Sequence, residues 1–377
     1  MQNLDRLHGP ESVGNESLYM QKKNILITGG AGFVGSSIAI HIKKKYPGYS
    51  IICLDNLKRR GSELNIPRLG SHDIRFIHGD IRNREDFYPC ETGLTTIIDA
   101  SAEPSVLAGL NNSPDYLINT NLTGTVNCLY LSAKTRADFI FISTSRVYPI
   151  ETIEKIAFSE SSTRFQLSEQ QEITGVSGNG IAENFPIEGF RSLYGATKLS
   201  SEFLIREFNQ FCGIRTVINR CGVLTGPWQM GKADQGVIVL WVARHFWKKD
   251  LGYFGYGGKG KQVRDILHIK DLCGLIDFQI HNMDKLSGSL FNVGGGQGIS
   301  VSLYELTLLC QKVTGNKVRI EEVTEDRQAD IRIYISDNSK VKASTGWSPA
   351  TLVEEIVTDV YHWIKENEIL LKPILLG

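Results

Sequence analysis

Tyr194 and Lys198, the ends of the run Tyr-Gly-Ala-Thr-Lys, are the side chains whose types and spacing best suit chemistry. On a helix, residues four positions apart leave the same face. A lysine ammonium beside a phenol stabilises the phenolate, so we expect Lys198 to lower the pKa of Tyr194 toward the working pH. Such a base can take the proton from an alcohol. The pair predicts redox chemistry on an alcohol, provided that the chain also binds a hydride acceptor.

A glycine-rich loop far upstream is suited to binding that acceptor. The motif Gly29-Gly-Ala-Gly32-Phe-Val-Gly35 follows the apolar run 24–28 and precedes a helical pattern. Its glycines permit a tight turn, a close approach to a pyrophosphate and close helix packing, while the helix N-terminus offers N–H groups to the phosphates. The motif in this context predicts a dinucleotide site.

Asp55 indicates which dinucleotide to expect. It ends the second apolar run, 50–55, and its carboxylate can accept both ribose hydroxyls while repelling a 2′-phosphate. The residue therefore favours NAD over NADP. Lys58-Arg59-Arg60 leaves an alternative open, because these cations could neutralise a phosphate, clasp the adenine or lie solvated on the surface.

Further candidates follow the later apolar runs. Ser143-Thr-Ser145 comes directly after the run 138–143, at the carboxyl end of a strand, where open α/β sheets bind ligands. One of its three hydroxyls could hydrogen-bond the reacting oxygen. Asp80 is either a contact to the adenine or an ordinary turn or cap residue, and the small residues of 100–103 leave room for a flat cofactor.

The elements that must position these residues follow an α/β pattern. Apolar runs alternate with helical segments, which predicts a doubly wound, Rossmann-type parallel sheet. Strands are expected at 24–28, 50–55, 74–78, 95–99, 138–143 and 214–219, with 289–293 rejoining the sheet. We expect a flexible N-terminal arm (1–23), a dinucleotide-binding domain (24–224 plus about 263–293) and a smaller substrate-binding domain (225–262 and 294–377). The substrate would bind in the cleft between the two domains.

Composition excludes several classes of function. Lys and Arg total 41, as do Asp and Glu, so neither nucleic acid nor a membrane surface is an expected partner. No run of about 18 apolar residues predicts a membrane span or a signal peptide. The seven cysteines are scattered without a C-x-x-C pair, which favours a reducing, cytoplasmic location. The histidines form no ligand-spaced cluster, so no metal is expected.

Taken together, the glycine loop, the hydroxyl run and the Tyr–Lys pair resemble the extended short-chain dehydrogenase/reductase family, in particular its nucleotide-sugar epimerases and dehydratases. The resemblance covers the chain from Asn24 to its last helix. It implies that Thr144 is the catalytic hydroxyl, that Tyr194 is the base and that Lys198 also binds the nicotinamide ribose. The cofactor-binding set so expected is Gly29, Gly32, Phe33, Val34, Gly35, Asp55, Asn56, Arg59, Asp80, Ile81, Ala100, Ala102, Asn121, Ser143, Tyr194 and Lys198.

Departures from the family pattern narrow the expected reaction. Sugar-nucleotide 4,6-dehydratases have Asp-Glu after the catalytic threonine, whereas this chain has Ser145-Arg146. Galactose-type 4-epimerases have an asparagine at the position of Val223. The chain is instead similar to the CDP-paratose (CDP-tyvelose) 2-epimerases. The matching segments are Thr163-Arg-Phe165, Asp234-Gln-Gly236, Gly260 to His268 and Asp330-Ile-Arg332.

The resemblance implies an NAD-dependent epimerase that oxidises a nucleotide-linked sugar transiently and returns the hydride to the opposite face. Tightly held NAD and a homo-oligomer, dimer or tetramer, are expected with it. Expected substrate contacts are Glu103, Ser145, Arg146, Gln229, Gln235, Arg264 and Arg332. Arg264 and Arg332 would grip the diphosphate and ribose or form salt bridges, and Glu103 and Arg146 would contact sugar hydroxyls or pair with each other. Open alternatives are a 4-epimerase, reductase or decarboxylase of another nucleotide sugar, and a non-catalytic NAD-binding scaffold.

Overall fold

Seven parallel strands form the central sheet of the computed structural model, which describes residues 22–110, 113–231 and 235–376. The strands are β1 (Asn24–Thr28), β2 (Ser50–Asp55), β3 (Arg75–His78), β4 (Thr96–Asp99), β5 (Asp138–Thr144), β10 (Thr216–Cys221) and β14 (Ser289–Val293). Their order is β14-β10-β5-β4-β1-β2-β3, and every pairing is parallel. The predicted fold class is confirmed, including the return of 289–293 to the sheet.

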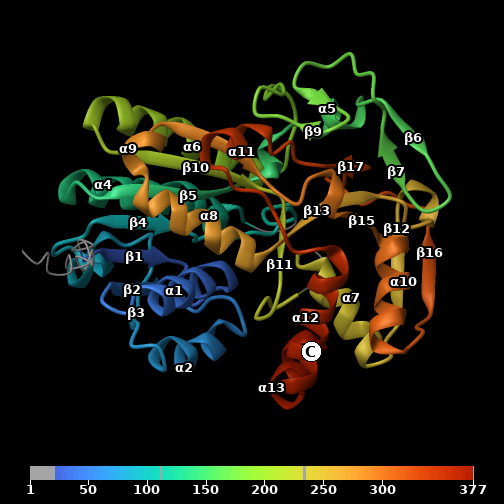
Figure 1. Ribbon diagram of the computed structural model, residues 1–377, viewed down its shortest axis with the longest axis horizontal. Coiled ribbons are helices and arrows are strands. Elements are labelled where there is room, and N and C mark those ends of the chain that lie inside the picture. Colours follow the sequence, from blue (N-terminus) through green and yellow to red (C-terminus); the bar gives the residue numbers. More distant parts are fainter. Residues whose placement is uncertain (1–21, 111–112, 232–234, 377) are drawn as a thin grey trace, which may run out of the picture.

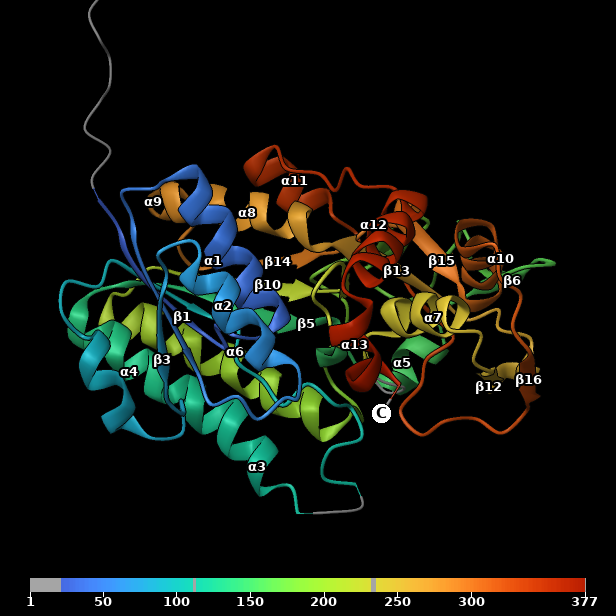
Figure 2. The same cartoon turned by 90° about the horizontal axis from the view of Figure 1, so that it is seen from below.

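Alternate residues of the strands face two apolar layers, as the period of two in a strand requires. Ile25 and Ile27 pack in one core cluster, whereas Leu26 between them packs in another. Figure 2 shows the helices of the two layers on opposite sides of the sheet. One layer contains α1 (Phe33–Lys45), α2 (Asn65–Gly70), α8 (Ile269–His281), α9 (Met283–Leu286) and α11 (Ser339–Thr345). The other contains α3 (Asp115–Ile118), a π-helical turn (Asn119–Gly124), α4 (Thr125–Thr135) and α6 (Leu193–Cys212).

The strand order reverses between β1 and β4. The chain proceeds from β1 outward through β2 and β3, then returns to continue through β4 and β5 on the other side of β1. At such a switch point the loops diverge and leave a crevice beyond the carboxyl ends of the strands. The glycine loop after β1 and the residues after β4 and β5 therefore meet at one edge of the sheet.

A second group of elements lies beyond that edge. It has a four-stranded sheet of β11 (Val223–Thr225), β13 (Val263–His268), β15 (Ser300–Ser302) and β17 (Ile333–Tyr334), and a pair of β12 (Leu251–Phe254) with β16 (Ile320–Val323). The helices are α7 (Val237–Phe246), α10 (Leu303–Thr314), α12 (Val353–Glu366) and α13 (Glu368–Leu375). Figure 1 shows α7, α10 and α12 close together, and their apolar faces share one core cluster.

The segment between β5 and α6 adds a small cap. It comprises α5 (Ile150–Glu154) and the short strands β6 (Phe158–Glu160), β7 (Phe165–Leu167), β8 (Val176–Ser177) and β9 (Gly180–Ile181). Its apolar residues pack against Leu199 of α6 and against Tyr334. This contact ties the cap to both groups of elements.

The domain boundaries expected from the sequence stay a prediction. Two elements cross them, because β13 pairs with β11, β15 and β17, while α11 packs on β14 through Val341. Residues 1–21 of the expected N-terminal arm lie outside the described residues. No helix in the described part of the chain is long and apolar enough to cross a membrane.

Candidate active site

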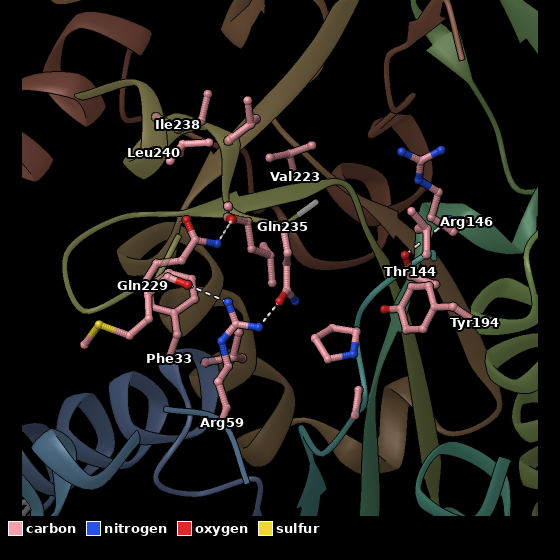
Figure 3. A pocket seen from close by; sticks show the side chains of 18 of the residues that line it. Phe33, Arg59, Thr144, Arg146, Tyr194, Val223, Gln229, Gln235, Ile238 and Leu240 are labelled. Carbon is pink, nitrogen blue, oxygen red and sulfur yellow. Dashed lines mark hydrogen bonds between the residues drawn. The ribbon is translucent and has the colours of Figure 1, made fainter. Parts of the chain in front are cut away.

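A cavity of about 1260 Å³ runs from the N-terminus of α1, past the carboxyl ends of β4 and β5, to β12 and α10. Figure 3 shows Arg59 and Gln229 on one side of it and Thr144, Arg146 and Tyr194 on the other. The sequence-predicted residues that line it are Gly29, Gly32, Phe33, Val34, Asp55, Asn56, Arg59, Ile81, Ala100, Ala102, Glu103, Ser143, Thr144, Ser145, Arg146, Tyr194, Gln229, Gln235 and Arg264. Gly35, Asp80, Asn121, Lys198 and Arg332 are not part of its lining.

Tyr194 is held against Thr144 by the start of α6. Ser192 caps this helix and accepts a hydrogen bond from the N–H of Gly195 at 3.2 Å. A Cβ on Gly195 would lie 2.1 Å from the carbonyl oxygen of Arg146, so only glycine lets α6 approach the turn Ser145–Val147 this closely. The first turn of α6 and the end of β5 are thereby locked together.

The pKa of Tyr194 is raised to about 12, chiefly by burial. A hydrogen bond with the Thr144 side chain and the positive charge of Arg146 act in the opposite direction. The prediction that Tyr194 has a pKa lowered toward neutrality is therefore wrong in this structure. The physical reason is that the loss of hydration around the phenolate outweighs both stabilising contacts.

Lys198 is buried outside the lining of the cavity. Its side chain is 1% exposed, and its ammonium lies 3.8 Å from the centroid of the Phe141 ring. Burial lowers the pKa of Lys198 to about 8, although the charges of Asp99 and Glu202 oppose this shift. Burial therefore reduces the protonated fraction of Lys198, although we expected this residue to act on the phenol through its positive charge.

A buried ion pair supports the strand ends beneath Tyr194. Arg220 on β10 and Glu202 on α6 are 2% and 1% exposed and pair at 2.7 Å. Ser143 donates to the same carboxylate at 2.5 Å, and Arg220 donates to the Tyr148 hydroxyl at 3.1 Å. Because each charge is paired and hydrogen-bonded, the network holds α6, β5 and β10 in one arrangement.

The glycine loop has the geometry of a phosphate cradle. Gly29 has a φ of 65°, which L-residues other than glycine rarely adopt. A Cβ on Gly35 would lie 2.3 Å from the carbonyl oxygen of Gly29. Gly35 therefore acts from outside the cavity, by allowing α1 to begin directly against the loop and present its N-terminus to the cavity.

Asp55 braces that loop as well as facing the cavity. Its carboxylate accepts hydrogen bonds from the N–H groups of Ala31 at 3.1 Å and Leu57 at 2.8 Å. Burial raises the pKa of Asp55, while these backbone bonds lower it. The residue is placed to receive ribose hydroxyls, and it also keeps the loop in shape.

Arg59 crosses the cavity. Its guanidinium donates to the side-chain oxygen of Gln235, as Figure 3 shows. It also donates to the carbonyl oxygen of Met230 at 2.5 Å. The sequence left open whether Arg59 neutralises a phosphate, clasps the adenine or lies solvated on the surface. The structure shows it in another role, as a bridge between two segments of the protein. Arg59 joins the loop after β2 to the segment that precedes α7, over the part of the cavity that begins at the glycine loop.

Asn121 and Asp80 support the cavity from behind its wall. Asn121 is fully buried, and its amide makes hydrogen bonds to both the N–H and the carbonyl of Glu103, at 2.8 and 3.1 Å. Asp80 accepts hydrogen bonds from Asn56 and Arg82. Burial acts to raise the pKa of Asp80, yet these partners lower it to about 2.

The two arginines expected to grip a diphosphate lie in different environments. Arg264 lines the cavity and pairs with Asp330 at 2.7 Å. Arg332 instead pairs with Glu154 at 3.3 Å and lies over the rings of Phe158 and Tyr256. Arg332 therefore forms a salt bridge outside the lining of the cavity, and the substrate contact expected for it stays a prediction.

Sequence reasoning missed Arg327, Phe254 and Gln262, all of which line the cavity. The guanidinium of Arg327 lies 3.8 Å from the centroid of the Phe254 ring, and Gln262 donates to the carbonyl of Phe254 at 2.9 Å. Arg327 stands three positions before Asp330, so the motif singled out in the sequence lies in the same loop as this arginine.

Glu103 and Arg146 do not pair with each other among the described residues. The Glu103 carboxylate accepts the N–H of Ser105 at 3.3 Å, whereas Arg146 donates to the carbonyl of Ala329 at 3.0 Å. Gln229 binds Thr225 and the carbonyl of Leu224. Asp234 of the matching motif lies outside the described residues. The described chain contains no group of three side chains able to hold a metal ion.

Comparison with known proteins gives this geometry a context. The model of the NAD dependent epimerase/dehydratase family matches residues 25–294. The chain is 29% identical to the CDP-paratose 2-epimerase of Salmonella typhi over 347 residues, which cover 90% of this chain and 98% of that enzyme. It is 28% identical to the UDP-glucose 4-epimerase of Bacillus subtilis (strain 168), over 91% of this chain and 97% of that enzyme. Among solved structures, the dTDP-glucose 4,6-dehydratase of Bacillus anthracis str. Ames in complex with NAD has a TM-score of 0.72 and 26% identity, covering 93% of this chain and 99% of that one.

Proposed function

This chain belongs to the NAD dependent epimerase/dehydratase family, and from that premise we propose that it is an epimerase of a nucleotide-linked sugar. The observation that carries the proposal is the set of side chains around Tyr194. The Thr144 side chain acts to lower the pKa of the Tyr194 phenol, and the next residues are Ser145 and Arg146. Neither of these exchanges a proton at neutral pH, so the turn offers the redox pair without the acid and base that expulsion of water would need.

NAD is the cofactor, and the residues of the glycine loop fit it. Gly29, Gly32, Phe33 and Val34 face the cavity at the N-terminus of α1, where a pyrophosphate finds unpaired N–H groups. Asp55 would receive the adenosine ribose. When bound, NAD supplies a hydride acceptor that can also return the hydride to the sugar.

Tyr194 would move the hydroxyl proton of the sugar. It would take that proton during oxidation and give it back during reduction, with Thr144 orienting the sugar oxygen. The raised pKa of Tyr194 suits the second half, in which the phenol donates. In the first half, Thr144 and the charge of Arg146 favour the phenolate.

Two arginines are proposed to bind the nucleotide part of the substrate, Arg264 at a phosphate and Arg327 beside the base and ribose. Arg264 and Arg327 line the same end of the cavity, and guanidinium groups bind phosphate oxygens with defined geometry. Phe254 beside Arg327 offers an aromatic face to the base or ribose. A CDP-hexose that reacts at C2 is the proposed substrate, supported by the similarity to the CDP-paratose 2-epimerase.

A cytoplasmic homo-oligomer is proposed for the protein in the cell. All seven cysteines are free thiols, and all except Cys212 are buried, which suits a reducing compartment.

The proposal is tested by NMR of a panel of nucleotide sugars incubated with the enzyme in D₂O and in H₂O. Return of the same hydride gives an inverted carbon without solvent deuterium and no net change of nicotinamide. Deuterium in the product would instead indicate a deprotonation route, and a 4-keto-6-deoxy product would indicate a dehydratase. Net consumption of added NADH would indicate a reductase.

A further inference from the structure

Three guanidinium groups are attached to one loop at the far end of the cavity. Arg327 belongs to this loop, Arg264 donates to Asp330 and to the carbonyl of Ile331 at 2.6 Å, and Arg146 donates to the carbonyl of Ala329 at 3.0 Å. All three line the cavity. We call these three side chains the arginine row. At one end of the row Arg327 lies over the Phe254 ring, and at the other end Arg146 follows Thr144.

The part of the arginine row formed by Arg264 and Arg146 carries excess positive charge. Arg264 has the Asp330 carboxylate as its ion-pair partner, while the ion pairs of the described chain give Arg146 none. The acceptor that Arg146 binds, the carbonyl of Ala329, is neutral. A guanidinium has five donors in a planar fork, so Arg146 retains donors for a further acceptor. Two neighbouring cations with one carboxylate favour an anion of more than one charge.

Of the three arginines, Arg146 is the nearest along the chain to Thr144, which it follows by two positions. Its N–H donates to the Thr144 hydroxyl at 3.2 Å, and its carbonyl packs directly on Gly195, next to Tyr194. Figure 3 shows the Arg146 guanidinium turned away from the Tyr194 hydroxyl, on the other side of Thr144. An anion on Arg146 would therefore bind close to the reacting carbon, but on the opposite side from the phenol.

Resting on the proposed function for the substrate class, we propose that Arg146 binds the sugar-proximal phosphate of a nucleoside diphosphate sugar, whereas Arg264 binds the phosphate next to the ribose. This contact makes Arg146 a specificity-determining residue. In a pyranose linked to that phosphate through C1, C2 is the adjacent ring carbon and C4 lies across the ring. A phosphate anchored beside Thr144 places C2 at Tyr194 and leaves C4 pointing beyond it.

The phosphate assignment is tested by binding, without turnover. Calorimetry on the NAD-loaded protein compares CDP with CMP, and UDP with UMP, in wild type, Arg146→Gln and Arg264→Gln. Loss of a charge-assisted hydrogen bond weakens binding by about tenfold to a hundredfold. Arg146→Gln should cause that loss for the diphosphates and leave the monophosphates unchanged, whereas Arg264→Gln should weaken both. Arg146→Lys should retain part of the preference for diphosphates.

Arg84→Gln is the matched control. This arginine lies over the Tyr130 ring, away from the cavity, and the variant should bind all four nucleotides as wild type does. The assignment would be overturned if Arg146→Gln weakened CDP and CMP equally, or if it weakened neither of them. In both cases the ratio of diphosphate to monophosphate affinity would stay as in wild type. Thermal unfolding of each variant separates a folding defect from a binding defect.

The choice of carbon is tested separately by NMR of the product. Inversion at C2 is expected, and inversion at C4 would overturn the positioning role. Absence of any epimerisation would refute the proposed function and with it the choice of carbon. In that case the ratio of diphosphate to monophosphate affinity would still decide whether Arg146 binds the second phosphate.

Discussion

On the cofactor side of the cavity, the lining residues follow β1, β2, β4 and β5 in chain order, each just after the strand that places it. On the substrate side, they come from short segments around 146, 229–230, 235, 251–264 and 327–330, which are separate in the sequence. The first side is shaped by a regular sheet and backbone N–H groups. The second is shaped by side-chain ion pairs across loops. The shape of the cofactor side therefore follows from the local sequence. The shape of the substrate side depends on contacts between residues that are distant in the chain.

The comparison also separates two kinds of buried charge. Beneath Thr144 and Tyr194, Arg220 and Glu202 form a closed network with Ser143 and Tyr148. In the substrate half, Arg146 is only partly compensated, and burial together with Arg264 lowers its pKa to about 10. Closed networks support structure, while incompletely paired charges are suited to ligand binding.

The largest expected effect is on chemistry at the border between the two halves. Tyr194→Phe should reduce turnover by about 10² to 10⁴ fold, because it removes the proton carrier, while bound NAD is retained. Steady-state kinetics and the absorbance of the released cofactor measure the two properties. Tyr304→Phe, on the surface of α10, is the control. Normal turnover in Tyr194→Phe would exclude the phenol as the base.

Glu202→Gln should destabilise the fold by about 3–5 kcal/mol, since it leaves Arg220 charged and buried without its partner. The free energy of unfolding from urea titration is the measurement. Glu354→Gln breaks the exposed pair with Lys312 and should change that free energy by less than about 1 kcal/mol. Similar effects of the two substitutions would show that the buried network does not support the sheet.

Gly35→Ala should weaken the cofactor half selectively. The added methyl group meets the Gly29 carbonyl, so the loop must move at a cost of about 1–3 kcal/mol, and NAD should be lost during purification. Affinity for CDP should stay normal. Gly48→Ala, where a Cβ meets nothing within 4 Å, is the control. Retention of NAD by Gly35→Ala would mean that the loop has room that the structure does not show.

The rate of the oxidative half-reaction should rise with pH. Since the pKa of Tyr194 lies at about 12, the phenol is protonated at neutrality, and its phenolate fraction grows about tenfold for each pH unit below that value. Stopped-flow absorbance of bound NADH between pH 6 and 9 measures this rate. A rate that is independent of pH throughout this range would contradict ionisation of Tyr194 as the step that limits oxidation.

The smallest effect is expected for Arg59→Ala, which cuts the bridge between the two halves. NAD should dissociate about fivefold faster, in line with about 1 kcal/mol for a lost hydrogen bond, while turnover with excess NAD stays near wild type. Dilution into NAD-free buffer followed by activity assays measures the loss. An unchanged dissociation rate would show that the bridge plays no part in retaining the cofactor.

Prediction from sequence succeeded where a motif and its structural context are contiguous. The strand before Gly29, the turn after it and the helix that begins at Phe33 are encoded within about one supersecondary unit, and all seven predicted strands form. It did not single out Arg327, because the direction of this side chain depends on how its loop packs against Phe254. It also failed for the Tyr194 pKa, because burial depends on the whole surrounding fold.

The amino-acid sequence by itself determined the parallel sheet, the dinucleotide loop and the Tyr–Lys pair, since periodicity and short-range spacing encode them. Among the three hydroxyls of 143–145, only the family resemblance singled out Thr144. Only the tertiary structure decided that Lys198 is buried over Phe141, that Arg59 crosses to Gln235 and that Arg146 and Arg264 share one loop. These relations join residues far apart in the chain, and they are set by the packing of the two groups of elements around one cavity.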